Sequence, residues 1–308
     1  MQLRGKGLAE ILGLEDPTDL DLRLGAVEAA DEARHVGDAQ LGAQVIKVKP
    51  PKDFIEQAEA KKVYEQAKQE GKPFFVWYAP MMPHDPHTPP ERLLAKYKGK
   101  TPSEHVAKYW AMVEWFDETC GELLKHLDDQ GVADNTIVLY LTDNGWIQNP
   151  DAPRYAPKSK QSQYDGGLRT PIMVRWPAKV KPQKSPELAM SIDLLPTVLK
   201  AVGIAAPAGL PGLNLLDAQA VAARKAIYGE CFTHNYVDMQ NPASSLKWRW
   251  VIEGDTKLIV PDKRNQPDDV VELYQLSQDP HEEKNLASTD PAKVATLTKL
   301  LDAWWPAK

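Results

Sequence analysis

The feature that most constrains the fold is a run of apolar and β-branched residues, from Thr136 to Thr142, with no alternation of polar and apolar side chains. A strand that is covered on both faces has this pattern, because neither face meets water. Asp143, Asn144 and Gly145 follow at once, and after a polar loop a second apolar run extends from Pro171 to Trp176. Ligands of open α/β sheets bind outside the carboxyl ends of strands. The sequence therefore predicts two buried strands that bracket a functional loop.

Helices and strands alternate upstream of this loop. A one-sided helix is predicted between Asp53 and Gly71, and residues 73–79 (PFFVWYA) are a further all-apolar run that predicts an interior strand. A long helix is predicted from its Ser103 cap to Gly131, with apolar side chains at three- and four-residue spacing that include Trp110 and Val113. This alternation predicts an α/β fold whose central sheet is mainly parallel and flanked by helices.

The composition changes at the Pro/Gly/Ala-rich stretch AAPAGLPGLNLLD. Beyond it, the alternating run LKWRWVI predicts a half-exposed antiparallel strand, and Gly254 lies in a predicted hairpin turn. Asp290 as the cap and Pro291 at the first helical position predict a terminal helix. We therefore predict three parts: a segment 1–50 without a buried strand pattern, an α/β domain over 51–205, and a smaller antiparallel α+β lobe with a terminal helix over 206–308.

Charge and cysteine content exclude several classes of protein. The 308 residues carry a formal net charge of −6 without a basic stripe, so we expect no nucleic-acid partner. No apolar run approaches the roughly 20 residues of a membrane span, and no signal-peptide stretch stands at the start, so we expect a soluble chain. The two cysteines, Cys120 and Cys231, are far apart, which indicates neither a disulfide framework nor a zinc site. Oligomeric state and compartment stay open.

Polar side chains near the strand ends are candidates for chemistry. Asp143 and Asn144 offer the hard oxygen atoms that Ca²⁺ and Mg²⁺ prefer, although the same two residues could simply form an Asx turn. His84 and His87 lie in the proline-rich loop MMPHDPHTPP. A zinc pair of these two histidines is disfavoured because prolines prevent the helix on which such pairs usually lie. Trp146 and Tyr155 could line a pocket or pack the loop.

Three motifs together resemble the sulfatase family of the alkaline-phosphatase superfamily: DNG after an apolar strand, Lys160 four residues before the tyrosine of YDGGLRTP, and PHDPHTPP upstream. They occur in the family's order and at its distances, and the resemblance covers about residues 50 to 308. It implies an alkaline-phosphatase-like fold and hydrolysis of a sulfate ester at a divalent cation, Ca²⁺ or alternatively Mg²⁺. The expected substrate is a sulfated small molecule or glycan; the family resemblance is compatible with a periplasmic or secreted location, and the compartment itself stays open.

The resemblance also implies roles for single residues. Asp143 and Asn144 would hold the metal, while Lys160 and His84 would contact the sulfate and assist departure of the alcohol. His87 repeats the His-x-Pro context and is the alternative to His84. Lys160 has a competing interpretation as a solvated surface lysine, because Lys158 is only two residues away. The remaining motif residues are predicted to be structural: Gly166 and Gly167 in a tight turn, and Arg169 in a pair with an acid.

The sequence departs from the family in three respects, because the nucleophile motif, the G-K-x-H segment and the first strand with paired aspartates are all missing. The family's nucleophile is a cysteine or serine in C/S-x-P-x-R that is converted to formylglycine, whereas Cys120 is followed by GELL and Cys231 by FTHN. The sequence therefore resembles a sulfatase without about its first third, and we expect little or no turnover from this chain alone. Two alternatives are a non-catalytic protein that binds sulfated glycans or a partner, and a phosphomonoester or phosphonate hydrolase of the same superfamily.

Overall fold

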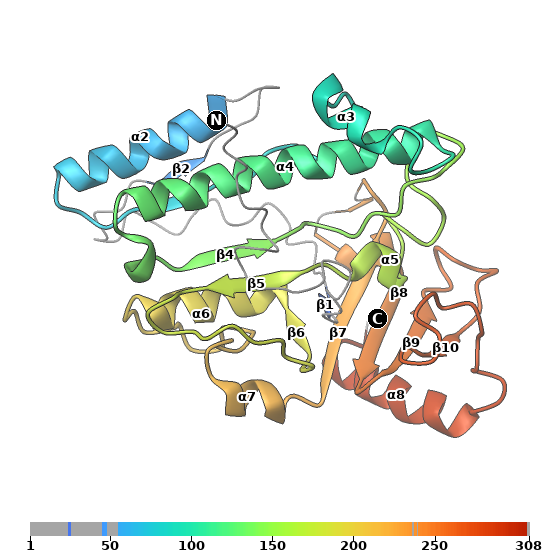
Figure 1. Ribbon diagram of the computed structural model, residues 1–308. Coiled ribbons are helices and arrows are strands. Elements are labelled where there is room, and N and C mark those ends of the chain that lie inside the picture. The colour runs from blue at the N-terminus through green and yellow to red at the C-terminus, as the bar shows by residue number, and fades with distance from the viewer. Residues whose placement is uncertain (1–23, 26–44, 48–54, 236, 239, 307–308) are drawn as a thin grey trace.

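The computed structural model describes residues 24–25, 45–47, 55–235, 237–238 and 240–306 (Figure 1). The predicted segment 1–50 lies outside these ranges, apart from the short strands β1 (Leu24–Gly25) and β2 (Val45–Lys47). No helix within the described ranges is both long enough and apolar enough to cross a membrane.

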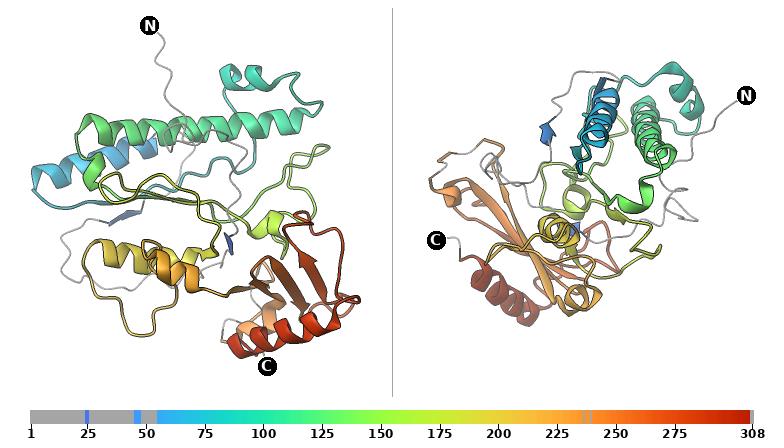
Figure 2. Two further views of the ribbon diagram at one scale, coloured as in Figure 1. Left: turned by 60° about the horizontal axis from the view of Figure 1, so that its bottom comes forward. Right: turned by 90° about the vertical axis from the view of Figure 1, so that its left-hand side faces the viewer.

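The first part of the chain forms layers of helices around short strands. In Figure 1, α2 and α4 lie on one side of the ribbon formed by β4 and β5, and α6 lies on the other side; Figure 2 shows the same order from two further directions. The elements after β2 are α2 (Ile55–Gln69), β3 (Phe75–Trp77), α3 (Glu91–Tyr97), α4 (Glu104–Asp129), a 3₁₀ turn (Ala133–Asn135), β4 (Val138–Leu141), α5 (Asp165–Leu168), β5 (Ile172–Arg175), β6 (Ala189–Met190), a 3₁₀ turn (Ser191–Asp193), α6 (Leu194–Ala201) and α7 (Ala218–Ala223).

The strands of this part pair in three separate ladders. β2 pairs with β3 and β1 pairs with β6, both in parallel. The two bracketing strands, β4 and β5, are antiparallel, with Val138 opposite Arg175 and Leu141 opposite Ile172. The prediction of a mainly parallel sheet is therefore wrong for this pair. The physical reason is the connection, because the loop between them contains only the single turn α5 and no crossover helix that would return the chain in parallel.

The strand β3 also differs from expectation. It was predicted to be interior, but the side chains of Phe75 and Trp77 are 45% and 56% exposed. Its only partner among the described residues is β2, so an apolar run alone does not reveal which neighbours cover it. The strand β4 is half-buried along most of its length, and Leu141 at its end is 38% exposed.

The long helix α4 begins and ends where its sequence indicates. The Ser103 hydroxyl accepts a hydrogen bond from the backbone N–H of Val106 at 3.2 Å, and Gly131 adopts a φ of +70° just after the helix. Its buried face is narrower than predicted, because Trp110 and Val113 are exposed. The buried side chains are small or of medium size: Ala107, Ala111, Met112, Thr119 and Leu124.

The predicted antiparallel lobe is present. Its sheet contains β7 (Ala226–Phe232), β8 (Leu246–Glu253), β9 (Thr256–Pro261) and β10 (Glu272–Gln275) in the order β10-β9-β8-β7, with all neighbours antiparallel. Gly254, at φ +60°, turns the chain between β8 and β9. The terminal helix α8 (Pro291–Trp304) starts as expected, since the Asp290 side chain accepts from the backbone N–H of Lys293.

Both faces of the lobe's sheet are covered, which corrects the half-exposed interpretation of β8. On one face, Trp250 of β8 and Ile259 of β9 pack against Leu168 of α5. On the other face, Val251 and Leu258 pack against α8, which lies along the sheet in Figure 1. The alternating polar residue Arg249 is also buried, because its guanidinium reaches Asp302 and the Trp305 carbonyl at the end of α8.

Candidate active site

Two residues selected from the sequence lie side by side. Lys160, in the loop between β4 and β5, places its Nζ atom 3.0 Å from Nε2 of His84, which is in the proline-rich loop after β3. A lysine ammonium group can only donate, so Nε2 accepts and the ring proton is on Nδ1. That nitrogen lies 2.7 Å from both the carbonyl oxygen and a carboxylate oxygen of Asp85. Asp85 therefore orients the imidazole toward Lys160.

An aromatic cluster adjoins this Lys160–His84 pair. The ring of Trp146 lies 6.3 Å from the ring of His84, and Nζ of Lys160 lies 5.8 Å from the Trp146 ring. Tyr109 of α4 stacks on Trp146 at 6.1 Å, and Tyr155 meets it edge-on at 5.5 Å. Trp146 thus connects three segments: the loop after β3, α4 and the loop after β4.

His87 is placed differently from His84. Its ring lies 5.4 Å from that of Tyr109 and 5.9 Å from that of Trp146. Burial lowers the pKa of His87 below its ordinary value, and its Nε2 atom has no hydrogen-bond partner among the described residues. His87 is therefore the half-buried histidine of this loop, while His84 is the exposed one that meets the lysine.

The predicted metal ligands, Asp143 and Asn144, form hydrogen bonds with neighbouring backbone groups. The Asp143 carboxylate accepts the backbone N–H of Asn144 at 2.9 Å, and the Asn144 amide donates to the carbonyl of Gly145 at 2.9 Å. An Asx turn would instead join Asp143 to the backbone N–H of Gly145, which donates to the carbonyl of Gly167, so these contacts are local without forming that turn. A carboxylate and an amide oxygen suit a hard cation. Within the described ranges, however, no group of three or more His, Cys, Asp or Glu residues could hold a metal, so the metal role stays a prediction that rests on two donors.

Lys158, the competitor of Lys160, is used elsewhere. Its Nζ atom donates to the backbone carbonyl of Glu282 and lies 4.4 Å from the ring of Tyr164. The two lysines therefore have different functions: Lys158 binds the loop to the lobe, and Lys160 faces His84.

The glycines of the motif allow close backbone packing. A Cβ atom on Gly166 would lie 2.3 Å from the carbonyl oxygen of Lys158, and one on Gly145 would lie 2.4 Å from the Gly166 carbonyl oxygen. The backbone N–H of Gly145 donates to the carbonyl of Gly167 at 2.8 Å. The predicted tight turn is present, but it is the one-turn helix α5, and its glycines serve contacts with other segments.

A buried ion cluster behind the loop was not foreseen as a whole. The fully buried Lys257 of β9 lies 2.8 Å from Oδ1 of Asp165 and 2.7 Å from Oε1 of Glu282. Arg169 pairs with Oδ2 of Asp165 at 2.8 Å, which confirms the predicted pairing with an acid. We call Lys257, Asp165, Glu282 and Arg169 the buried ion cluster. Besides the predicted pairing of Arg169, the sequence signal for this cluster is a lysine in the mostly apolar run of β9.

Electrostatics within the cluster follow from burial and pairing. Burial would raise the pKa of Asp165, but the positive charges of Lys257 and Arg169 outweigh it and hold that pKa below its ordinary value. Burial would lower the pKa of Lys257, but the carboxylates of Asp165 and Glu282 outweigh it and raise that pKa. Burial raises the pKa of Glu282, and Lys257 offsets this only in part.

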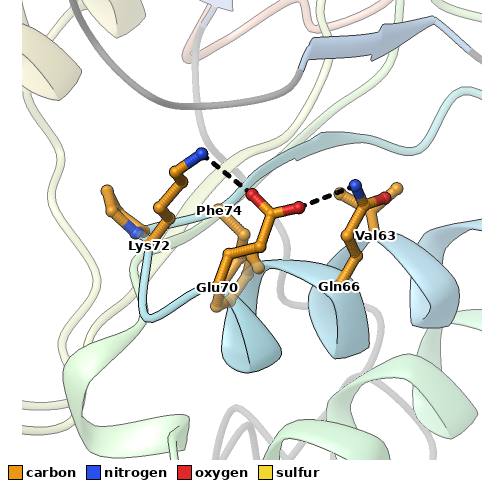
Figure 3. Close-up of a pocket in the computed structure, with 7 residues that line it drawn as sticks. Val63, Gln66, Glu70, Lys72 and Phe74 are labelled. Atoms are coloured by element: carbon orange, nitrogen blue, oxygen red, sulfur yellow. Dashed lines mark hydrogen bonds and ion pairs between the residues drawn. The ribbon is translucent and has the colours of Figure 1, made fainter.

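A small hollow at the end of α2 is separate from the candidate site. Figure 3 shows Glu70 between Gln66 and Lys72, each 2.9 Å away, at the edge of a cavity of about 10 Å³. A cavity of this size has room for about one water molecule. None of its lining residues belongs to the loops that carry Lys160 and His84: Val63, Gln66, Ala67, Glu70, Lys72, Pro73 and Phe74.

Comparison with known proteins agrees with the motifs. Residues 46–204 match the sulfatase family, and residues 158–303 match the C-terminal family of N-sulphoglucosamine sulphohydrolase. A relative from Bacteroides thetaiotaomicron, an N-acetylgalactosamine-6-O-sulfatase, is 28% identical over 75% of this chain and 47% of its own. The chain spans about half the length of the first curated relatives that it matches.

Solved structures share the fold. A sulfatase from a Pseudoalteromonas species has a TM-score of 0.59 and 22% identity, over 85% of this chain and 55% of its own. A protein solved in complex with its substrate, D-glucosamine-2-N,6-O-disulfate, has a TM-score of 0.66 and 19% identity, over 82% of this chain and 69% of its own. The ordered motifs, the α/β arrangement shared with solved sulfatases and the match over more than half of its residues establish that this chain belongs to the sulfatase family.

Proposed function

We propose that this chain provides the sulfate-binding part of a sulfate ester hydrolase, with Lys160 and His84 as the residues that contact the sulfate group. The observation that carries the proposal is the 3.0 Å contact between Nζ of Lys160 and Nε2 of His84. Two groups that both interact with anions, brought together from loops 76 residues apart, form a site for one small anion. Because the chain belongs to the sulfatase family, we take this anion to be the sulfate group of an ester.

The two side chains have different tasks in this proposal. The ammonium group of Lys160 binds a sulfate oxygen and stabilises the negative charge that develops as the S–O bond to the alcohol breaks. His84 is oriented by Asp85 at Nδ1, so that in its protonated form it donates the Nε2 proton to the departing alcohol oxygen. These residues account for sulfate binding and alcohol departure; attack on sulfur requires a nucleophile that none of them provides.

We further propose a sulfated sugar as the substrate. Trp146 lies beside the pair and is itself only half-buried, so it offers an aromatic surface next to the anion. The similar N-acetylgalactosamine-6-O-sulfatase and the protein bound to D-glucosamine-2-N,6-O-disulfate are named for sulfated sugars, which supports this substrate class. Non-catalytic binding of the same ligands is the alternative, and turnover of an aryl sulfate by the chain would exclude it.

The metal is also part of the proposal. Asp143 and Asn144 would supply two oxygen ligands to Ca²⁺ or Mg²⁺, and the bound cation would draw negative charge from a sulfate oxygen. We expect CaCl₂ to raise the unfolding temperature of the chain, and we expect Asp143→Ala to abolish the rise. An equal rise in both proteins would remove Asp143 from the set of metal ligands.

Ligand binding tests the sulfate site directly. Binding of D-glucosamine-2-N,6-O-disulfate is measured by titration calorimetry, with D-glucosamine as the unsulfated control. Lys160→Met should weaken binding by about tenfold or more, because a hydrogen bond to a charged group contributes about 1.5–3 kcal/mol. Lys181→Met, at an exposed lysine, is the matched control and should leave affinity unchanged. Equal affinities for the two variants would contradict the assignment.

Turnover is followed in parallel with an aryl sulfate and an aryl phosphate. Release of the aryl alcohol from the sulfate alone identifies a sulfatase, and release from the phosphate alone identifies a phosphohydrolase. Binding without turnover of either ester fits both the non-catalytic alternative and the expectation that this chain alone turns over little or nothing, whereas cleavage of the aryl sulfate excludes the non-catalytic alternative. His84→Ala should affect turnover of an ester with a poor leaving group more than that of an activated aryl ester, because only the former needs a proton at the departing oxygen.

A further inference from the structure

The backbone on both sides of Lys160 is held in an unfavourable conformation. Lys158 and Gln161 have φ values of +58° and +64°, a region that residues with a side chain rarely adopt. Such conformations persist where the surrounding structure fixes them. The contacts that fix this segment therefore also determine where Lys160 lies.

The residues next to Lys160 are anchored from two directions. Ser159 is 1% exposed, and its hydroxyl accepts the backbone N–H of Ile147 at 2.6 Å. Lys158 donates to the backbone carbonyl of Glu282, a residue of the C-terminal lobe. The side chain of Lys160 is thus free to face His84, while its neighbours are bound to the protein.

The helix α5 contacts both the C-terminal lobe and the segment that carries Lys160. Cβ atoms on Gly166 and Gly167 would lie 2.3 Å and 2.2 Å from the carbonyl oxygens of Lys158 and Ser159. The backbone of α5 is therefore in direct contact with the two residues that precede Lys160. A shift of α5 cannot occur without a shift of these carbonyl groups.

The buried ion cluster fixes α5 on the lobe. Lys257 contacts the side chain of Asp165, the first residue of α5, and the Glu282 carboxylate accepts the backbone N–H of Asp165 at 2.5 Å. Glu282 is 1% exposed and itself adopts a φ of +55°. Buried charges of this kind tolerate few alternative arrangements, because an unpaired partner would be strongly destabilised.

We propose that Lys257 and Glu282, both in the C-terminal lobe, are positioning residues for the Lys160–His84 pair. They hold α5, and the backbone carbonyl of Glu282 accepts a hydrogen bond from the Lys158 ammonium group. Through these contacts they set the backbone from which the Lys160 ammonium group reaches Nε2 of His84. Neither residue touches the proposed sulfate site. The part of this inference that concerns ligand affinity rests on the proposed function, whereas the geometric part does not.

The test uses the nitrogen resonances of the His84 ring in the full chain. Two-bond ¹H–¹⁵N spectra report which ring nitrogen carries the proton and whether the other one accepts a hydrogen bond; the His84 signals are assigned by their loss in His84→Gln. Spectra are compared for the unmodified chain, Lys160→Met and Lys257→Met. We expect the Nε2 signal in Lys257→Met to move toward its position in Lys160→Met, although Lys160 is still present.

A matched control separates positioning from loss of stability. Leu297→Ala removes a fully buried side chain of α8 from the core on the opposite face of the same sheet. This variant is destabilised but should keep the His84 signals of the unmodified chain. If Lys257→Met does not fold, Glu282→Gln takes its place, because it retains the size and an acceptor oxygen while removing the charge that faces Lys257.

The outcomes are distinct. A folded Lys257→Met or Glu282→Gln with unchanged His84 signals overturns the inference, and so does an equal shift in Leu297→Ala. Affinity for D-glucosamine-2-N,6-O-disulfate should fall about tenfold in the variants whose His84 signals move. If the signals move but the unmodified chain shows no affinity for this ligand, the positioning role stands and the proposed function fails.

Discussion

Replacing Gly167 by alanine perturbs the contact between α5 and the loop before it. The new Cβ atom would lie 2.2 Å from the carbonyl oxygen of Ser159 and 2.9 Å from the carbonyl oxygen of Ser162. Close carbon–oxygen contacts in proteins are about 3.3–3.6 Å, so the first distance is too short by roughly 1 Å. Both atoms belong to the backbone and cannot rotate away. Since overpacking a buried site costs about 1–3 kcal/mol, we expect a loss near the upper end of this range.

The assay is urea unfolding, with Gly131→Ala as the control. Nothing lies within 4 Å of a Cβ atom on Gly131, but its φ of +70° disfavours alanine, which costs about 1 kcal/mol. We expect Gly167→Ala to lower the free energy of unfolding by more than Gly131→Ala does, and to move the His84 ring signals as well. A smaller loss for Gly167→Ala than for Gly131→Ala would refute the close packing on which the placement of Lys160 depends.

Three further predictions concern stability. Lys257→Met should lower the free energy of unfolding by about 3–5 kcal/mol, because it leaves two carboxylates buried without their partner; a loss below about 1 kcal/mol would mean that water enters the cluster. Burial raises the pKa of Tyr109 to about 12, and Lys257, whose burial is outweighed by its carboxylates, also has a raised pKa. Both groups bind protons more tightly when folded, so their contribution to stability should be fully present below about pH 10 and should be lost as the pH rises through 12, with Tyr109 contributing about 2–3 kcal/mol. Urea curves that stay unchanged between about pH 10 and 12 would contradict this. Asp290→Ala should cost about 1 kcal/mol through loss of the α8 cap, measured by thermal unfolding, and Asp290→Asn should retain most of that stability.

Local features of the chain could be predicted because they depend on nearby residues. The caps at Ser103 and Asp290 each accept a backbone N–H three residues ahead, and Gly254 provides the positive φ that its hairpin needs. The order and spacing of the motifs also led to Lys160 rather than Lys158, and the two lysines have the separate contacts described above. Each of these inferences required only a short stretch of sequence.

Features that depend on distant residues could not be predicted. Lys257 and Asp165 are 92 positions apart, and nothing in either neighbourhood indicates the other. The antiparallel pairing of β4 and β5 depends on the path of the intervening loop, and the exposure of Trp77 depends on which elements cover β3. Apolar periodicity indicates that a side chain can be buried, but its neighbours in space decide whether it is.

The placement of Lys160 combines two requirements that conflict in a flexible side chain. A lysine that binds an anion must have its ammonium group accessible, yet holding a mobile lysine costs about 1.5–2 kcal/mol in side-chain entropy and a further 1–2 kcal/mol for its backbone. Here the conformational entropy of the backbone is already lost when the protein folds, because Ser159 is buried and Lys158 is bound to the lobe before any ligand arrives. Only the side chain of Lys160 remains to be ordered, and its contact with His84 already restricts it. In the proposed sulfate site, the positive φ values and the buried charges around this lysine would therefore contribute to anion affinity without touching the anion.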